Sequence, residues 1–174
     1  MQEFFERAKH LRLVIFDVDG VLTDGSLYLG DGGQEYKAFY SLDGHGMKML
    51  KRSGVELAII TGRTSGVVSH RAKNLGIVHL YQGVENKAEA YQHLLEKLQL
   101  APEASAYMGD DVVDLPVMRR CGLALTVPDA PALVKEHAHY VTRLGGGRGA
   151  AREACEMIMR AQGTLEAQLA HYLQ

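Results

Sequence analysis

The chain has 174 residues, of which 47% are hydrophobic and 23% charged, and its formal net charge at pH 7 is −2. This size and balance suit one globular domain with a buried core, and the spread of Lys and Arg along the chain excludes an electrostatic footprint for nucleic acid or an anionic membrane. The first ten residues hold no apolar run typical of a signal peptide, and no segment is long enough to span a bilayer, so we expect a cytoplasmic protein.

Apolar strands alternate with helical segments along most of the chain. Leu13–Phe16 is continuously apolar, which is typical of a strand buried on both faces of a parallel sheet. Further strands are expected at residues 55–60, 104–108 and 123–127, and helices at residues 46–52, 66–75, 87–98 and 114–121. The alternation predicts an α/β fold, a Rossmann-like parallel sheet with helices on both faces, in a single domain of residues 1–174.

Two segments depart from this alternation. Residues Ser26–Tyr40 read as two alternating strands around an Asp31-Gly32-Gly33 turn, which predicts a projecting β-hairpin at about residues 26–40. The tail, at about residues 145–174, opens with the glycine-rich run Gly145–Gly149 and continues as a helix from Ala150 to about residue 173. The glycine run could cradle a phosphate because it precedes a helix. It lacks the full dinucleotide-binding pattern, however, and we expect a flexible hinge there.

Polar side chains follow the predicted strands where those strands end. They are Asp17 and Asp19 after the first strand, Thr61 after the strand that ends at Ile60, Asp110, Asp111 and Asp114 after Met108, and Lys87 at the start of a helix. Because the carboxyl ends of parallel strands share one edge of the sheet, we expect these side chains to meet there. Crowded carboxylates repel one another unless a cation offsets them, and oxygen ligands that must also hold a phosphate suit Mg²⁺.

The same residues carry a resemblance to a known family. Residues 17–24, Asp-Val-Asp-Gly-Val-Leu-Thr-Asp, resemble the first motif, DxDGxxT/V, of the haloacid dehalogenase (HAD) superfamily. Thr61, Lys87 and the segment Gly-Asp-Asp-Val-Val-Asp at residues 109–114 match its second, third and fourth motifs in order. Only the hairpin follows the first motif, and no cap domain lies between the second and third motifs.

The resemblance implies a magnesium-dependent phosphatase. Asp17 would attack phosphorus and form an aspartyl-phosphate, and Asp19 would serve as general acid and then as general base. Thr61 and Lys87 would stabilise the charge of the transferring group as further catalytic residues. The metal ligands implied are Asp17, the backbone carbonyl of Asp19, and Asp110, with Asp111 and Asp114 supporting them.

The hairpin and residues 39–46 and 61–77 are similar to one capless branch of the superfamily, the phosphatases of 3-deoxy-D-manno-octulosonate 8-phosphate (KDO 8-phosphate) in lipopolysaccharide precursor synthesis. This resemblance implies a homotetramer whose hairpins pack together and whose tails approach a neighbour's active site, where Arg148 is our candidate contact. The branch usually has Arg where this chain has Leu42. The substrate contacts implied are Asp19, Tyr40, Ser41, Leu42, Asp43, Gly44, Lys48, Arg63, Arg71 and Lys87.

Three other functions remain open at this point. A receiver-like signalling module also gathers aspartates, a Thr and a Lys around Mg²⁺, but it holds the phosphoryl group instead of turning it over. An interaction protein on a disarmed HAD scaffold would lack catalytic residues, whereas every expected position is filled here. A phosphatase of another sugar acid phosphate, such as a nonulosonate 9-phosphate, would carry the same motifs, because the motifs read only the phosphate.

Overall fold

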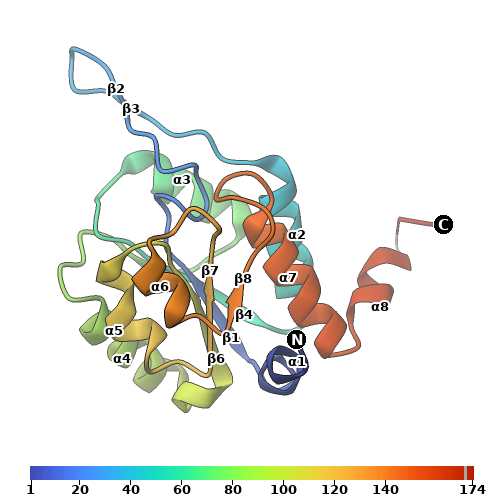
Figure 1. The fold of residues 1–174 in the computed structure, drawn as a ribbon. Helices are drawn as coiled ribbons and strands as arrows, with labels where there is room; N and C mark the ends of the chain where they lie inside the picture. Colours follow the sequence, from blue (N-terminus) through green and yellow to red (C-terminus); the bar gives the residue numbers. More distant parts are fainter. Residues whose placement is uncertain (171) are drawn as a thin grey trace.

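A six-stranded parallel sheet forms the centre of the protein, which is seen here in a computed structural model that describes residues 1–170 and 172–174 (Figure 1). The strands lie in the order β5-β4-β1-β6-β7-β8. Every residue of β1 is buried, because helices cover both faces of the sheet at its centre. The strands are β1 Leu13–Phe16, β4 Glu56–Ile60, β5 His79–Tyr81, β6 Ser105–Met108, β7 Leu123–Thr126 and β8 Tyr140–Val141.

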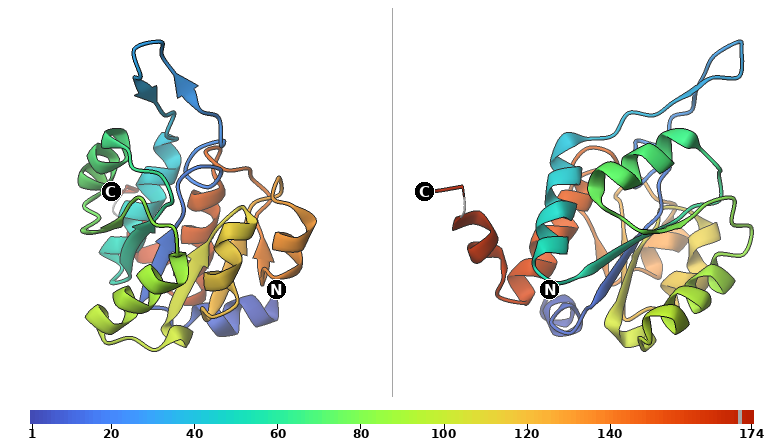
Figure 2. Two further views of the ribbon diagram at one scale, coloured as in Figure 1. Left: turned by 90° about the vertical axis from the view of Figure 1, so that its left-hand side faces the viewer. Right: turned by 180° about the vertical axis from the view of Figure 1, so that it is seen from behind.

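The helices lie in two layers, one on each face of the sheet (Figure 2). Right-handed crossovers from β1 toward β5 place α2 and α3 on one face, and the return crossovers place α4, α5 and α6 on the other. α7 packs against α2, and α1 packs against α7. The helices are α1 Gln2–Ala8, α2 Ser41–Arg52, α3 Gly66–Leu75, α4 Lys87–Leu98, α5 Leu115–Met118, α6 Ala132–Glu136, α7 Ala150–Ala161 and α8 Leu165–Ala170, with 3₁₀ turns at Pro102–Ala104 and Val112–Asp114.

The structure confirms the predicted fold class and corrects some of its boundaries. α2 begins at Ser41, well before the predicted start at residue 46. Glycines lower helix propensity there, but Asp43 accepts hydrogen bonds from two backbone amides at the start of α7, and this tertiary contact supports the extra turn. The tail helix is interrupted, because Gly163 adopts a left-handed conformation (φ 68°) between α7 and α8. Residue 171, inside the predicted tail helix, lies outside the described residues.

The predicted hairpin is present and projects away from the sheet (Figure 1). Its strands, β2 Tyr28–Leu29 and β3 Glu35–Tyr36, pair antiparallel around a turn closed by a hydrogen bond from the Gly30 amide to the Gln34 carbonyl (2.8 Å). The chain between β4 and α4 contains only α3 and β5, so the described residues include no cap domain. Among the described helices, none has the length and hydropathy to cross a membrane.

The glycine-rich run Gly145–Gly149, which we call the glycine strap, is packed and is not the flexible hinge that we expected. The Gly147 amide donates to the Val21 carbonyl (3.0 Å), which ties the strap to the loop after β1. A Cβ atom on Gly146 would lie 1.8 Å from the Gly20 carbonyl oxygen. Glycine is therefore required at residue 146 by the close approach of two backbones.

Replacing Gly146 by Ala should destabilise the protein. The added methyl group meets backbone atoms that cannot rotate away, so we expect the free energy of unfolding to fall by about 2 kcal/mol, as in overpacked cores. Gly66→Ala is the control, because that site is open and helical, and it should be neutral or stabilising by about 0.5 kcal/mol. Urea unfolding measures both variants, and equal stabilities would contradict the packing argument.

Candidate active site

A cavity of about 600 Å³ opens at the carboxyl ends of β1, β4 and β6. This is the edge of the sheet at which the sequence predicted a site. The cavity is lined by Asp17, Asp19, Gly25, Leu27, Thr61, Gly62, Arg63, Val84, Glu85, Lys87, Asp110, Asp111 and Val113. Every predicted catalytic residue therefore faces one space.

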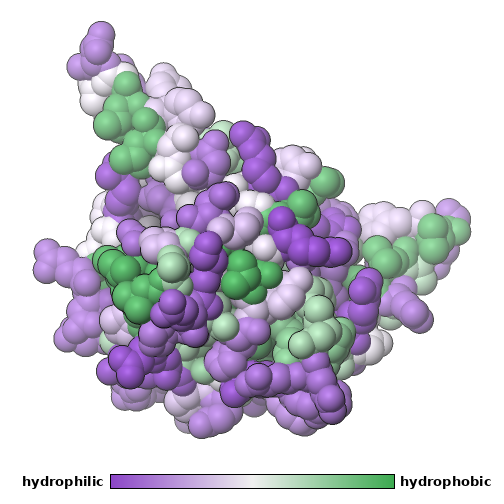
Figure 3. Space-filling view, in the orientation of Figure 1, coloured by the Kyte–Doolittle hydropathy of each residue, from purple (hydrophilic) through white to green (hydrophobic). Residues whose placement is uncertain are grey.

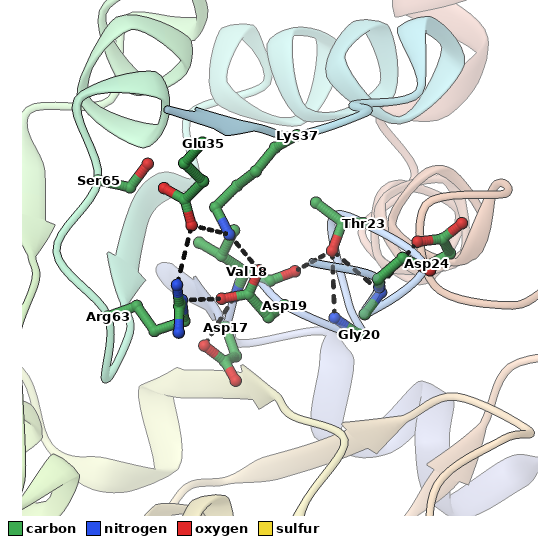
Figure 4. A network of polar contacts seen from close by, with 12 residues as sticks. Asp17, Val18, Asp19, Gly20, Thr23, Asp24, Glu35, Lys37, Arg63 and Ser65 are labelled. Atoms are coloured by element: carbon green, nitrogen blue, oxygen red, sulfur yellow. Dashed lines mark hydrogen bonds and ion pairs between the residues drawn. The ribbon is translucent and has the colours of Figure 1, made fainter. Parts of the chain in front are cut away.

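The loop after β1 turns tightly above the sheet (Figure 4). Three successive amides, those of residues 21–23, donate to the Val18 carbonyl at 2.9–3.2 Å. Gly20 allows the turn because its φ is +90°, a conformation that side chains disfavour. The Thr23 hydroxyl accepts hydrogen bonds from the amides of Gly20 (3.3 Å) and Gly25 (3.1 Å), and so fixes the loop that carries Asp17 and Asp19.

Lys87 joins two carboxylates beneath the cavity. It is the first residue of α4, whose N-terminus is capped by the Asn86 side chain. Its Nζ lies 3.0 Å from Asp17 Oδ2 and 2.7 Å from Asp114 Oδ1. Burial alone would lower the pKa of Lys87, but the carboxylates of Asp17 and Asp114 raise it, so the ammonium stays charged.

Asp114 has no oxygen lone pair to spare. Its Oδ1 accepts from Lys87 and from the Tyr107 hydroxyl (2.6 Å), and its Oδ2 accepts from the amides of Asp110 (3.0 Å) and Asp111 (3.1 Å). A carboxylate offers about four acceptor positions, so these four donors saturate it. Asp114 therefore orients the surrounding groups. Asp17, whose two oxygens each have one partner, keeps further acceptor positions for a ligand.

The charge in this cluster is not balanced. Oxygens of Asp17, Asp110 and Asp114 lie within 4.8 Å of one another, and within the described part of the chain Lys87 is the one ammonium paired with them. Burial, together with the charge of Asp114, raises the pKa of Asp17 to about 6. Burial and the neighbouring carboxylates raise the pKa of Asp110 to about 7. The site therefore has an excess of negative charge.

This donor set fits Mg²⁺, because hard oxygen ligands and excess negative charge favour a hard divalent cation. Asp17 and Asp110 would hold the ion, together with the backbone carbonyl of Asp19. Asp111 lines the same cavity but is not a member of this oxygen cluster. Its side chain caps the turn at Val112–Asp114 by accepting from the Val112 amide (2.7 Å).

The Asp19 carboxylate has two cationic neighbours (Figure 4). Lys37 Nζ forms an ion pair and hydrogen bond with Asp19 Oδ1, and Arg63 Nε lies 3.9 Å from Oδ2. Glu35 Oε1 contacts both cations, at 3.3 Å from Lys37 and 3.1 Å from Arg63. Sequence reasoning missed Lys37 and Glu35. Opposite charges two residues apart on an extended segment share a face, which could have paired these two residues with each other but not with Asp19.

Several predicted substrate contacts lie away from the cavity lining. Tyr40 is the N-cap of α2, and Ser41 to Gly44 form its first turn. The buried Asp43 carboxylate accepts from the amides of Gly149 (3.3 Å) and Arg152 (2.8 Å). Arg71 donates to the Tyr40 carbonyl (3.3 Å) and stacks over the Phe39 ring. Ser41, Leu42 and Lys48 are exposed on α2. Of the predicted substrate contacts, those that line this cavity are Asp19, Arg63 and Lys87.

Comparison with known proteins gives consistent matches. The family model of haloacid dehalogenase-like hydrolases matches residues 31–122. The 3-deoxy-D-manno-octulosonate 8-phosphate phosphatase KdsC of Escherichia coli K12 is 52% identical over 160 residues, which cover 92% of this chain and 85% of that protein. Two solved structures of 3-deoxy-D-manno-octulosonate 8-phosphate phosphatases are also similar.

The structure from Yersinia pestis is 51% identical, with a TM-score of 0.93, over 94% of this chain and 89% of that one. The structure from Moraxella catarrhalis, in complex with a magnesium ion, a phosphate ion and KDO, is 44% identical, with a TM-score of 0.97, over 99% of each chain.

The raised pKa values predict how stability depends on pH and on Mg²⁺. Aspartates in the unfolded chain ionise near pH 4. Between about pH 4 and about pH 7 the folded cluster holds protons that the unfolded chain has released. The contribution of this cluster to the free energy of unfolding therefore falls as the pH rises. A bound cation replaces those protons, so Mg²⁺ should stabilise the protein far more at pH 7.5 than at pH 5.

Thermal unfolding at both pH values, in EDTA and in Mg²⁺, measures this effect. At a concentration about 100 times its dissociation constant, Mg²⁺ should raise the midpoint by about 5–10 °C at pH 7.5. Asp110→Asn is the control, and it should remove most of the Mg²⁺ effect. A Mg²⁺ effect of the same size at both pH values would contradict the link to these carboxyls.

Proposed function

We propose that this chain, which belongs to the haloacid dehalogenase-like hydrolases, is a magnesium-dependent phosphatase that hydrolyses KDO 8-phosphate to KDO and inorganic phosphate. The observation that carries the proposal is the arrangement of Asp17, Lys87 and Asp110 around one cavity, with Asp19 beside them. Relatives at about half sequence identity are named for this activity, and this chain matches 85–89% of their length.

Asp17 is the nucleophile in this proposal. Its Oδ1 accepts from the Val18 amide (2.7 Å) and its Oδ2 contacts Lys87, so the carboxylate is fixed at the floor of the cavity. Attack by one oxygen on phosphorus forms the aspartyl-phosphate and breaks the bond to the sugar oxygen. Asp19 gives its proton to that departing oxygen, then takes a proton from the water that hydrolyses the aspartyl-phosphate.

The other groups stabilise the transferring phosphoryl group. Lys87 supplies a fixed ammonium, and Thr61, buried at the carboxyl end of β4, supplies a hydroxyl. Mg²⁺, when bound, neutralises charge on the phosphoryl oxygens. Asp114, which also accepts a hydrogen bond from the Tyr107 hydroxyl, holds Lys87 in place.

The sugar acid carries a carboxylate as well as a phosphate, so its site needs a further cation. Arg63 meets this need, because it lines the cavity and is half exposed. The predicted contacts on α2 and α3, which include Lys48 and Arg71, do not line the cavity of this chain. In our proposal they reach a substrate only if a second copy of the chain brings them to its site.

A homotetramer, in which the hairpins pack together, is part of the proposal. Figure 3 shows apolar residues gathered on the projecting hairpin, where Leu27, Tyr28, Leu29 and Tyr36 are all about half exposed or more. A two-stranded ribbon cannot bury such residues by itself, and exposed apolar patches mark protein interfaces. The tail also extends from the body of the molecule, as α8 (Figure 1). A reducing cytoplasmic location fits the two cysteines, which are both free and buried.

A panel of sugar phosphates tests the proposed function. With Mg²⁺ we expect KDO 8-phosphate to give the highest kcat/KM, at least about tenfold above a nonulosonate 9-phosphate and simple hexose phosphates. EDTA should abolish turnover. Asp17→Asn should lower kcat by at least about 10³-fold, because the amide cannot form the phosphoenzyme.

Each outcome of the panel has a distinct meaning. Equal rates on all sugar phosphates would contradict the substrate and leave the phosphatase class intact. Wild-type rates in Asp17→Asn would contradict the covalent mechanism. A single burst of phosphoenzyme without steady release would indicate a receiver-like module.

The hairpin surface predicts the effect of charges on assembly. Leu29→Glu and Tyr36→Glu should lower the molecular mass in solution from tetramer toward monomer, because buried charges without partners are costly. Leu133→Glu is the matched control, since Leu133 is about half exposed on α6, far from the hairpin in sequence, and this change should leave the mass unaltered. Light scattering with size-exclusion chromatography measures all three variants, and a monomeric wild type at micromolar concentration would contradict the tetramer.

A further inference from the structure

A closed ring of alternating charges connects the hairpin to the cavity (Figure 4). Asp19 pairs with Lys37, Lys37 with Glu35, Glu35 with Arg63, and Arg63 lies 3.9 Å from Asp19 again. The four residues come from three segments: the loop after β1, the second hairpin strand with the residue after it, and the loop after β4. Their charges sum to zero. We call this group the hairpin ring.

Lys37 is an unusual member of an exposed hairpin. The side chain of Lys37 is only 1% exposed, whereas its neighbour Tyr36 is 65% exposed. Burying an ammonium is costly unless opposite charges compensate it closely. Both compensating carboxylates, Asp19 and Glu35, are themselves largely covered. Lys37 is therefore buried in order to pair with carboxylates, and one of them is Asp19 at the cavity.

The contact also fixes the Asp19 carboxylate. Among the described residues, Lys37 is the one hydrogen-bond donor to that carboxylate, because Arg63 at 3.9 Å is beyond hydrogen-bond distance. A group that must deliver a proton to one oxygen atom needs a fixed orientation, because small misplacements reduce rates strongly. Without Lys37, the Asp19 side chain would be free to rotate into the cavity or away from it.

We infer that Lys37 is a positioning residue, which holds the acid–base carboxyl of Asp19 toward the leaving oxygen, and that Glu35 keeps Lys37 and Arg63 in place around it. The inference rests on the proposed function and adds to it a role for the hairpin within its own active site. The alternative is that Lys37 only anchors the hairpin to the body of the protein.

Two substrates with different leaving groups distinguish a positioning role of Lys37 from an anchoring role. A sugar alkoxide needs a proton as it departs, whereas p-nitrophenolate is a stable anion and needs none. For both esters kcat/KM reports the step that forms the aspartyl-phosphate, so later hydrolysis does not affect the comparison. Loss of a positioned acid therefore lowers kcat/KM for KDO 8-phosphate and leaves that for p-nitrophenyl phosphate nearly unchanged. Loss of hairpin anchoring lowers both values together.

The experiment compares Lys37→Met, Lys37→Arg and Asp19→Asn with the wild type on both esters in Mg²⁺. For Lys37→Met we expect kcat/KM to fall about 10–100-fold on KDO 8-phosphate and less than about threefold on p-nitrophenyl phosphate. Asp19→Asn, which removes the acid itself, should show the same unequal loss of kcat/KM at larger size. Lys37→Arg keeps the charge and should recover most of the loss. Lys97→Met is the matched control, because Lys97 is exposed on α4, and it should alter neither rate.

A uniform loss on both esters in Lys37→Met, or no loss on either, would overturn the positioning role. Glu35→Gln gives a second test should Lys37→Met fail to fold. It retains an acceptor for Lys37 but removes the central charge of the ring, so the same unequal loss should appear at smaller size, and equal losses would overturn the inference. Wild-type turnover that persists in Asp17→Asn would instead contradict the proposed phosphatase mechanism, independently of the result for the Lys37 variants.

Discussion

Repulsion among buried carboxylates is the constraint on which the rest of the site depends. Asp17, Asp110 and Asp114 meet within 4.8 Å at the end of two adjacent strands, β1 and β6. Such a cluster is stable only where donors and cations surround it, and the fold provides them from several directions. Lys87 enters from α4, Tyr107 from within β6, and two backbone amides from the loop that follows β6. The charge that these donors leave uncompensated is the basis of cation binding.

The same constraint explains why glycines surround the cluster. A Cβ on Gly20 would lie 2.0 Å from Asp110 Oδ2, and a Cβ on Gly109 would lie 2.4 Å from Asp114 Cγ. The glycine strap presses on Gly20 from the other side, through Gly146. Close contacts thus connect the start of the tail, the loop after β1 and the Asp110 carboxylate, a proposed metal ligand. The strap contributes no charge, yet it limits where Gly20, and with it Asp110, can lie.

The sequence allowed the sheet and the centre of the site to be predicted, for a physical reason. Buried parallel strands are continuously apolar, and ligands of such sheets bind at the carboxyl ends of the strands. Leu13–Phe16 and the candidate residue Asp17 could therefore be recognised together. Short elements such as β8 and α6 lack enough residues to show a period. The early start of α2 depends on Asp43 meeting amides more than a hundred residues away. Lys37 could not be assigned to Asp19 either, because nothing local fixes how a hairpin folds back over the sheet.

The hairpin combines two demands that a short ribbon cannot meet alone. Two-stranded ribbons are marginally stable in water, and only two residue pairs, Tyr28 with Tyr36 and Leu29 with Glu35, join its strands. At its base, the hairpin is held to Asp19 by the buried ammonium of Lys37, whose partners Asp19 and Glu35 are largely covered. Along its length, the exposed apolar residues need a further surface, which our proposal assigns to other copies of the chain. Since Glu35 and Tyr36 are consecutive and point to opposite faces of one strand, a force that orders the apolar face also orders the charged face. Assembly and acid–base chemistry would then depend on the same strand, which explains how a site without a cap domain can be organised from outside the sheet.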